Sequence, residues 1–333
     1  MMPCTRWQHR FPHQKRTVWI PPLLCAVAFL IYFFYFCPDY SNPVDPVDLT
    51  DKNECTCGPC NQKTLMTPWF QEHFNGSIEP LLVRKDQVIP DHVLKWWLKL
   101  QGKNNVSQIP WILEELFKVI PSGNPYEEQN NRPCRRCAVV GNSGNLKGSS
   151  HGEIIDSHNF IIRMNGARTA GFEADVGSRT THHFMYPESA VHLSHGVHLV
   201  LVPFKLQDLR WITSALSTGE IKVTYTRVKQ FIQADKDKIL IFNPTFFKYI
   251  HDNWTKHHGK YPSTGMLALF FALHICDEIS VFGFGADRKG NWHHYWENNR
   301  FAGAFRWTGV HNADFESNLI EALAAEGRLK FYK

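Results

Sequence analysis

The C-terminal two thirds of the sequence alternate short apolar runs with helical patterns, and this alternation constrains the fold more than any other feature. The runs cover residues 137–141, 160–164, 199–204, 239–242 and 279–284. Each has the length and composition of a buried strand, and helical stretches such as 264–276 separate several of them. This pattern predicts an α/β domain with a largely parallel sheet.

The first of these runs ends abruptly at the polar turn Gly141-Asn-Ser-Gly144. The turn lacks the spacing of Gly-x-Gly-x-x-Gly, the serine elbow Gly-x-Ser-x-Gly and the lysine of a phosphate-binding loop. Ligands of open α/β sheets bind at the carboxyl ends of strands, where Asn142 offers both a donor and an acceptor. The turn therefore fits either a nucleotide or sugar site or a plain connection.

The N-terminal segment has the features of a membrane anchor. Residues 18–36 carry no charge, which is just enough chain to cross a bilayer. Arg6, Arg10, Lys15 and Arg16 precede this run, so the rest of the chain is expected on the non-cytoplasmic side. A cleaved signal peptide is the alternative, but no small-x-small cleavage site follows. We expect a cytoplasmic tail at 1–17, a transmembrane signal anchor at 18–36, a stem at 37–54 and a lumenal domain at 55–333.

The cysteines and sequons agree with a lumenal domain. The cysteines beyond the anchor are Cys55, Cys57, Cys60, Cys134, Cys137 and Cys276. Their even number favours disulfides in an oxidising compartment. The spacing of the first three also fits half of a zinc site, although no second paired cluster has suitable spacing. Sequons for N-glycosylation occur at Asn75, Asn105 and Asn253.

Acidic and histidine motifs leave several chemistries open. Asp235-Lys-Asp237 matches the Asp-x-Asp that holds a divalent metal in many sugar-nucleotide transferases, but its flanking lysines also fit a solvated turn. His311 lies five residues before Glu316, and a histidine near a carboxylate can act as a general base. No His-Glu-x-x-His occurs, which argues against a zinc peptidase. The net charge of +5 is scattered without a Lys/Arg run, so nucleic acid is not an expected partner.

Four segments, taken together, resemble the animal sialyltransferases. Residues 134–183 resemble the large sialylmotif, residues 261–285 the small sialylmotif, "HHYWE" at 293–297 motif III, and His311 to Glu316 the very small motif. They occur in the family's order over about half of the lumenal chain. The upstream "CTCGPC" and "WWLKLQ" further resemble the β-galactoside α-2,3-sialyltransferases that act on Galβ1-3GalNAc.

The resemblance implies a fold and an activity. The fold is a variant of glycosyltransferase-A, a single Rossmann-like domain with a mostly parallel central sheet flanked by helices, preceded by a transmembrane anchor. The activity is inverting transfer of sialic acid from CMP-sialic acid to the 3-hydroxyl of galactose in Galβ1-3GalNAc of O-glycans and glycolipids. No metal or other cofactor is implied, so Asp235-Lys-Asp237 would not be a metal site. The implied location is the Golgi membrane, as a single-pass type II protein whose partners are galactose-terminated glycoprotein and glycolipid glycans.

The resemblance also implies residue roles. His311 would be the general base, and His294 would stabilise the departing CMP phosphate. The donor would contact Asn142, Asn165, Tyr186, Ser263, Thr264, Gly265 and Gly285. Gln101 and Tyr261 would bind the acceptor galactose. The implied disulfides are Cys55–Cys60, Cys57–Cys134 and Cys137–Cys276. Asn312 departs from the family pattern, which carries Asp there, and its effect on the neighbouring base stays open.

Other functions remain open at this stage. The chain fits a sialyltransferase of different acceptor or linkage preference, a transferase of another sugar, or a catalytically inactive lumenal glycan-binding protein of the same fold. A binding protein would be expected to lack the equivalents of His294 or His311, and both are present. A hydrolase would need a serine elbow or a carboxylate dyad, and we find neither. The sequence leaves the oligomeric state undetermined.

Overall fold

The computed structural model describes residues 67–84, 87–101, 106–126, 133–287, 289–298 and 309–333. These residues belong to one unit, Asn53–Lys333. The expected tail, anchor and stem lie outside the described residues. Within the described ranges, no helix is both long and apolar enough to cross a bilayer.

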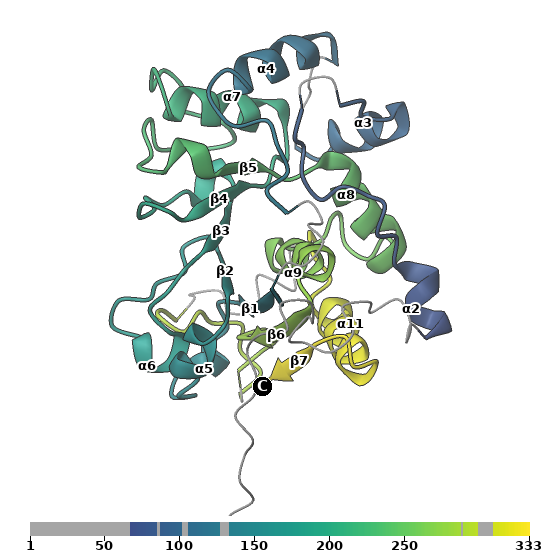
Figure 1. The fold of residues 1–333 in the computed structure, drawn as a ribbon, viewed down its shortest axis with the longest axis vertical. Coiled ribbons are helices and arrows are strands. Elements are labelled where there is room, and N and C mark those ends of the chain that lie inside the picture. Colours follow the sequence, from purple (N-terminus) through teal and green to yellow (C-terminus); the bar gives the residue numbers. More distant parts are fainter. Residues whose placement is uncertain (1–66, 85–86, 102–105, 127–132, 288, 299–308) are drawn as a thin grey trace, which may run out of the picture. The chain divides into compact units, whose positions relative to one another are not determined.

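Seven parallel strands form the central sheet (Figure 1). They are β1 (Arg136–Val140), β2 (Phe160–Met164), β3 (His182–Met185), β4 (His198–Leu201), β5 (Ile239–Ile241), β6 (Glu278–Phe282) and β7 (Lys330–Tyr332). Their order is β5-β4-β3-β2-β1-β6-β7, and each neighbouring pair of these strands is parallel. The predicted α/β class and the parallel sheet are therefore confirmed.

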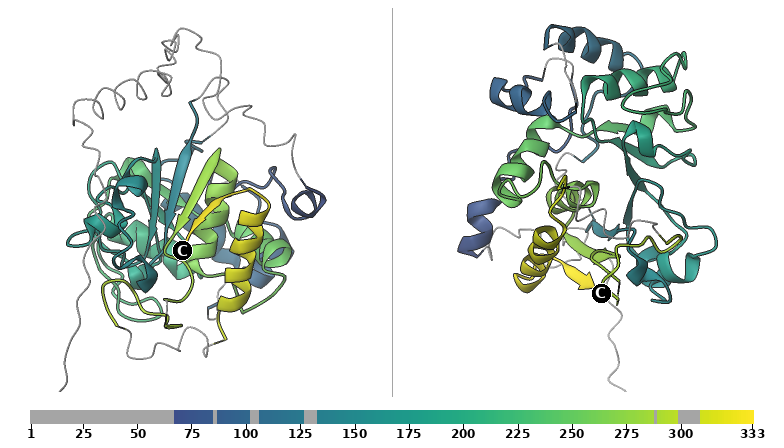
Figure 2. Two further views of the ribbon diagram at one scale, coloured as in Figure 1. Left: turned by 90° about the horizontal axis from the view of Figure 1, so that it is seen from below. Right: turned by 180° about the vertical axis from the view of Figure 1, so that it is seen from behind.

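Helices cover both faces of this sheet. They are α2 (Pro68–His73), α3 (Asp91–Trp97), α4 (Ile109–Leu116), α5 (Gly152–Asp156), α6 (Glu173–Val176), α7 (Leu206–Ala215), α8 (Pro244–Tyr249), α9 (Thr264–Ile275) and α11 (Ala313–Ala325). Shorter turns are η2 (Val106–Gln108), η3 (Gly144–Leu146), η4 (Pro187–Ser189), η5 (Lys236–Lys238) and the π-helical η6 (Ile250–Trp254). Helices α9 and α11 lie on one face, and α5 and α6 lie on the other (Figures 1 and 2).

Strand β1 shows why its sequence is apolar at every position from Cys137 to Val140 and does not alternate between apolar and polar residues. Cys137 and Val139 pack in the larger core cluster with α9, whereas Ala138 and Val140 pack in the smaller cluster with residues of α5 and α6. All four are buried. A strand buried on both faces requires apolar residues at every position, which is what the predicted run displayed.

Two strands, β3 and β7, were not predicted. Strand β3 contains the buried His182 and His183, whose polar rings interrupt an apolar pattern. Their rings are satisfied internally: Nε2 of His183 donates to the carbonyl oxygen of Asn165 (2.7 Å), and Nε2 of His182 lies 2.5 Å from the hydroxyl of Tyr126. Burial lowers the pKa of His183 to about 4, so this ring stays neutral in the core.

The described residues between 67 and 120 form short helices ahead of the first strand. The segment contains three separate helices and a 3₁₀ turn, because its prolines interrupt a continuous helix. Proline occupies the first turn of α2 and α4, where its missing N–H costs nothing. Asp91 is the first residue of α3, and Pro90 stands at its N-cap.

The expected disulfide between Cys137 and Cys276 is present, with 6.1 Å between the two Cα atoms. It joins β1 to the residue that caps the end of α9. Cys134 is also disulfide-bonded. Cys55, Cys57 and Cys60, on which the other two expected pairs depend, lie outside the described residues.

We predict that the Cys137→Ala/Cys276→Ala variant unfolds with a free energy lower by about 5 kcal/mol, because the bond closes a loop of 139 residues. Urea unfolding followed by tryptophan fluorescence measures the difference. Cys137→Ala alone removes the same cross-link and should lose a similar amount. A free Cys276 thiol in non-reducing peptide mapping, or a loss below about 1 kcal/mol, would show this expectation to be wrong.

Candidate functional site

The turn after β1 packs directly against the turn after β6. The backbone N–H of Gly141 donates to the carbonyl of Phe282 (2.7 Å), and the N–H of Ser143 donates to that of Gly283 (3.0 Å). A Cβ atom on Gly141 would lie 2.3 Å from the Gly283 oxygen, so this contact requires glycine. In the sheet, β1 lies between β2, the next strand in the chain, and β6. The turn thus stands where strand order reverses, the position at which open α/β sheets bind ligands.

The segment 292–297 is held on top of this turn. The N–H of Gly144 donates to the carbonyl of His293 (2.8 Å), and the N–H of Tyr295 donates to that of Asn142 (3.1 Å). The ring of Tyr295 is buried, and its hydroxyl donates to the carbonyl of Arg168. Residues that are about 150 positions apart are therefore fixed side by side by backbone hydrogen bonds.

A cavity of about 680 Å³ lies over these strand ends. It is lined by every residue to which the resemblance assigned donor, acceptor or catalytic roles: Gln101, Asn142, Asn165, Tyr186, Tyr261, Ser263, Thr264, Gly265, Gly285, His294 and His311. Their shared location is what a single catalytic site requires.

Asn142 and Asn165 have acceptor atoms prepared for a ligand. Nδ2 of Asn142 donates to the carbonyl of Met164 (3.1 Å), and Asn165 adopts a left-handed backbone conformation (φ 55°) at the end of β2. The Oδ1 atoms of both side chains are buried and have no hydrogen-bond partner among the described residues. A buried acceptor without a donor costs about 1–3 kcal/mol, so a ligand that donates hydrogen bonds here would recover that free energy.

The start of α9 is tied to the start of α11 beneath the cavity. Ser263 caps α9 through its hydroxyl, which accepts from the N–H of Met266 (3.2 Å). The carboxylate of Glu316 accepts from the N–H (2.8 Å) and the hydroxyl (2.6 Å) of Ser263. Burial raises the pKa of Glu316 to about 7. The sequence spacing placed Glu316 near His311, but in the structure its carboxylate contacts Ser263 and thereby joins the starts of the two helices.

Asn312, the departure from the family pattern, is the N-cap of α11. Its Oδ1 accepts from the N–H of Phe315 (3.0 Å). Asparagine and aspartate are about equally good at this position. The substitution is therefore compatible with the same helix start.

His311 has a defined tautomer. Its Nδ1 lies 2.8 Å from the carbonyl oxygen of Tyr261. A carbonyl oxygen can only accept, so the ring proton is on Nδ1 and the basic lone pair is on Nε2. Burial lowers the pKa of His311, which favours the neutral ring. This is the state that a general base needs.

The ring of His294 is oriented by two neighbours. Its Nδ1 lies 3.0 Å from Oε1 of Glu297, and its ring stacks on that of Trp296 with centroids 4.5 Å apart and planes 8° from parallel. The pairing with a carboxylate makes Nδ1 the donor. The ring is therefore held in one orientation at the edge of the cavity.

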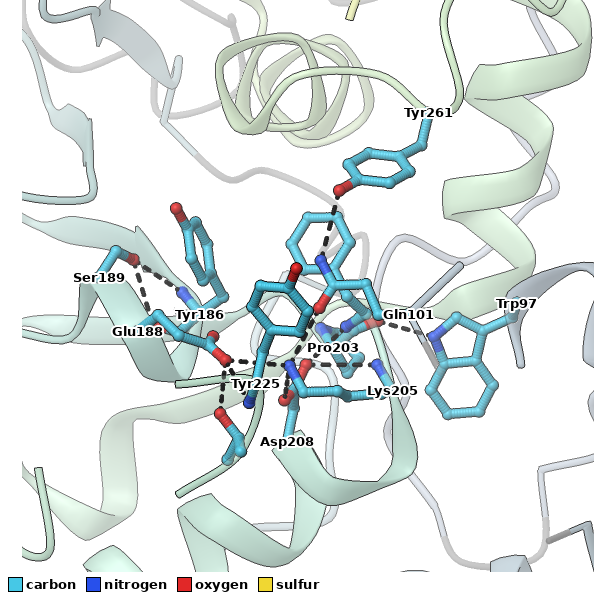
Figure 3. A network of polar contacts seen from close by, with 12 residues as sticks. Trp97, Gln101, Tyr186, Glu188, Ser189, Pro203, Lys205, Asp208, Tyr225 and Tyr261 are labelled. Atoms are coloured by element: carbon cyan, nitrogen blue, oxygen red, sulfur yellow. Dashed lines mark hydrogen bonds and ion pairs between the residues drawn. The ribbon is translucent and has the colours of Figure 1, made fainter. Parts of the chain in front are cut away.

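A polar network adjoins the cavity lining at Gln101, Glu188 and Tyr261 (Figure 3). Nε2 of Gln101 lies 3.3 Å from the hydroxyl of Tyr261, and Oε1 of Gln101 lies 3.0 Å from Nζ of Lys205. The same ammonium contacts the carboxylates of Glu188 (3.2 Å) and Asp208 (2.8 Å). The two residues expected to bind an acceptor sugar are thus in contact with each other.

Several cavity residues were missed at the sequence level. They are Glu188, Phe204, Tyr225, Thr226, Trp292 and Trp296. Glu188 follows β3 by three residues, so the strand that escaped detection also concealed it. Trp296 lies within the "HHYWE" segment that resembles motif III, but no role was assigned to it.

The remaining motifs lie away from the cavity lining. Asp235 and Asp237 are not among the lining residues: Oδ2 of Asp235 pairs with Nδ1 of His195 (2.7 Å), and its Oδ1 accepts from the N–H of Asp237 (3.2 Å). The described residues contain no group of three or more His, Cys, Asp or Glu arranged to hold a metal. Asn75 and Asn253 are exposed, and Asn105 lies outside the described residues.

Comparison with known proteins identifies the family. The glycosyltransferase family 29 (sialyltransferase) profile matches residues 81–328. Over 279 residues, 84% of this chain and 80% of the relative, the sequence is 58% identical to mouse CMP-N-acetylneuraminate-beta-galactosamide-alpha-2,3-sialyltransferase 2. The human type 1 enzyme of the same name is 52% identical over 84% of this chain and 82% of its own length.

Solved structures agree with the sequence relatives. A mammalian sialyltransferase crystal structure is 50% identical, with a TM-score of 0.77 over 84% of this chain and 98% of that chain. A second mammalian sialyltransferase structure, in complex with Gal-beta-1-3GalNAc-ortho-nitrophenol, has the same identity and TM-score and is covered over 99% of its chain. With the family profile spanning well over half of its length, this chain belongs to glycosyltransferase family 29, the sialyltransferases.

Proposed function

We propose that this sialyltransferase transfers sialic acid from CMP-sialic acid to the 3-hydroxyl of galactose in Galβ1-3GalNAc, with inversion at the anomeric carbon. The observation that carries the proposal is His311, a cavity histidine whose proton is held on Nδ1 by the Tyr261 carbonyl. The names of the relatives and the disaccharide in one related structure support the choice of acceptor.

The reaction is a single displacement. Nε2 of His311 takes the proton of the galactose hydroxyl while its oxygen bonds to the anomeric carbon of the donor. The bond from that carbon to the CMP phosphate breaks, and its electron pair goes to the phosphate oxygen. His294 and the N-terminal amides of α9 stabilise the departing phosphate, since a helix N-terminus favours an anion.

The donor is placed by the strand ends. Oδ1 of Asn142 and Oδ1 of Asn165 accept hydrogen bonds from the N–H or O–H groups of CMP-sialic acid, which satisfies both buried atoms. Ser263, Thr264 and Gly265 line the same cavity at the start of α9, as do Tyr186 after β3 and Gly285 after β6.

We further propose that residues 18–36 anchor the enzyme in the Golgi membrane as a single-pass type II protein, with residues 55–333 in the lumen. The charge-free length of the segment and the basic residues before it support this placement. The Cys137–Cys276 disulfide suits an oxidising lumen. Galactose-terminated glycans of glycoproteins and glycolipids are the proposed partners.

His311→Ala should lower kcat by about 10²–10⁴ while CMP still binds, because the donor contacts lie on other residues. In the wild-type enzyme, kcat should stay high as the pH is lowered and should decline only below about pH 6.5. Burial lowers the pKa of His311, and the ring loses its base function only when it is protonated. His195→Ala, at an exposed histidine outside the cavity lining, is the control. Near-normal turnover of His311→Ala would rule out the base role.

Galβ1-3GalNAc should be used at least about tenfold better than Galβ1-4GlcNAc in kcat/KM. The polar groups around Gln101 and Tyr261 are fixed by hydrogen bonds, and an acceptor that leaves such groups unpaired binds poorly in the transition state. Steady-state kinetics on both disaccharides and NMR of the product linkage measure this. Equal kcat/KM values, or a product not linked at the 3-hydroxyl, would contradict the assignment.

Activity should stay within a few-fold in EDTA, because a nucleoside monophosphate donor presents one phosphate that protein donors can stabilise. Asp235→Ala/Asp237→Ala should likewise retain turnover, since neither carboxylate lines the cavity. Loss of activity in EDTA with recovery on adding Mn²⁺ would instead establish a metal requirement.

A further inference from the structure

A buried lysine determines how the acceptor end of the cavity is arranged. Lys205 is 6% exposed and is not among the residues that line the cavity. Its ammonium lies 3.0 Å from Oε1 of Gln101, 3.2 Å from Oε1 of Glu188 and 2.8 Å from Oδ1 of Asp208 (Figure 3). An ammonium group has N–H donors and no acceptor; the contacts with Gln101 and Glu188 are hydrogen bonds, and the contact with Asp208 is an ion pair.

The ammonium fixes the orientation of the Gln101 amide. Because Lys205 can only donate, the amide oxygen of Gln101 faces it, and the amide nitrogen therefore faces the hydroxyl of Tyr261 (3.3 Å). The Tyr261 oxygen accepts from that nitrogen, so the hydroxyl proton of Tyr261 is available to a different acceptor. Tyr261 and Gln101 both line the cavity, where that acceptor would be a ligand oxygen.

The same lysine also contacts Glu188, a second residue that lines the cavity. Oε1 of Glu188 accepts from the ammonium, from the hydroxyl of Thr224 and from the N–H of Tyr225 (2.9 Å). Glu188 and Tyr225 line the cavity, and Tyr225 is 76% exposed. Lys205, which follows β4, thus contacts Gln101 after α3, Glu188 in η4 and Asp208 in α7.

We propose that Lys205 is a positioning residue for the acceptor sugar: it turns the Gln101 amide so that Tyr261 donates its hydroxyl proton to an acceptor oxygen. This inference rests on the proposed galactoside transfer. A purely structural lysine would instead serve to neutralise Asp208, whose other oxygen accepts from the N–H of Phe204 (2.8 Å) at the start of α7. The two roles differ in which kinetic constant changes.

The decisive experiment is the kinetics of Lys205→Met, which keeps the chain length and removes the three donors. The KM for Galβ1-3GalNAc should rise by about 10–100-fold, the range of one lost hydrogen bond to a charged group. The KM for CMP-sialic acid and the rate of its hydrolysis without acceptor should stay within twofold. Lys248→Met is the matched control, since Lys248 pairs with Asp252 (2.5 Å) outside the cavity lining.

A double-mutant cycle with Gln101→Ala tests whether Lys205 changes the acceptor KM through Gln101. If Lys205 acts through Gln101, Lys205→Met should add less than about threefold to the acceptor KM in the Gln101→Ala background. Full additivity, an unchanged acceptor KM, or a parallel loss for donor and acceptor with a lower Tm would each overturn the proposal.

Lys205→Arg keeps the positive charge and decides the question if Lys205→Met does not fold. The planar guanidinium of arginine cannot reproduce the geometry of an ammonium. The acceptor KM should therefore rise by a few-fold, less than for Lys205→Met, with the donor KM unchanged. An acceptor KM equal to that of the wild type would overturn the proposal. A wild-type enzyme that hydrolyses CMP-sialic acid but transfers to no galactoside would defeat the proposed function itself, and this inference with it.

Discussion

The contact between the turns that follow β1 and β6 is the constraint on which the site depends. Gly141 and Gly283 approach so closely that a Cβ on the first would lie 2.3 Å from the carbonyl oxygen of the second. Gly283 itself has φ 69°, and a Cβ there would meet Leu146 at 2.4 Å. Two glycines thus allow the backbones to pair beyond the strands, and this pairing supports the segment that carries His294.

Tyr261 connects the two chemical tasks of the cavity. Its carbonyl oxygen holds the proton of His311 on Nδ1, and its hydroxyl accepts from the amide of Gln101. The ring of Tyr261 also lies edge-on to that of His311, with centroids 5.2 Å apart. The proposed base and the proposed acceptor contact are therefore set by the backbone and the side chain of one residue, so a displacement of Tyr261 would disturb both.

The sequence predicted the parts of the fold that repeat a simple pattern. The strands buried on both faces appear as mostly apolar runs, so β1, β2, β4, β5 and β6 were found even though β2 contains the buried Arg163. Strand β3 was missed because its two adjacent histidines look polar in one dimension. The lining residues named by motif came from the resemblance and not from periodicity. Glu188 and Lys205 were missed because their importance arises from contacts between distant elements. Glu316 was named for its spacing from His311, but its contact with Ser263, 53 positions away, was not predicted.

The central claim is that donor and acceptor meet in this cavity with His311 as the base. A crystal structure of the enzyme with CMP and Galβ1-3GalNAc measures it directly, through the distance from Nε2 of His311 to the 3-hydroxyl oxygen of galactose. Our account predicts a hydrogen-bond distance of about 2.6–3.2 Å, with the CMP phosphate near His294 and the start of α9. A galactose whose 3-hydroxyl points away from His311, or a nucleotide bound outside the cavity, would contradict it.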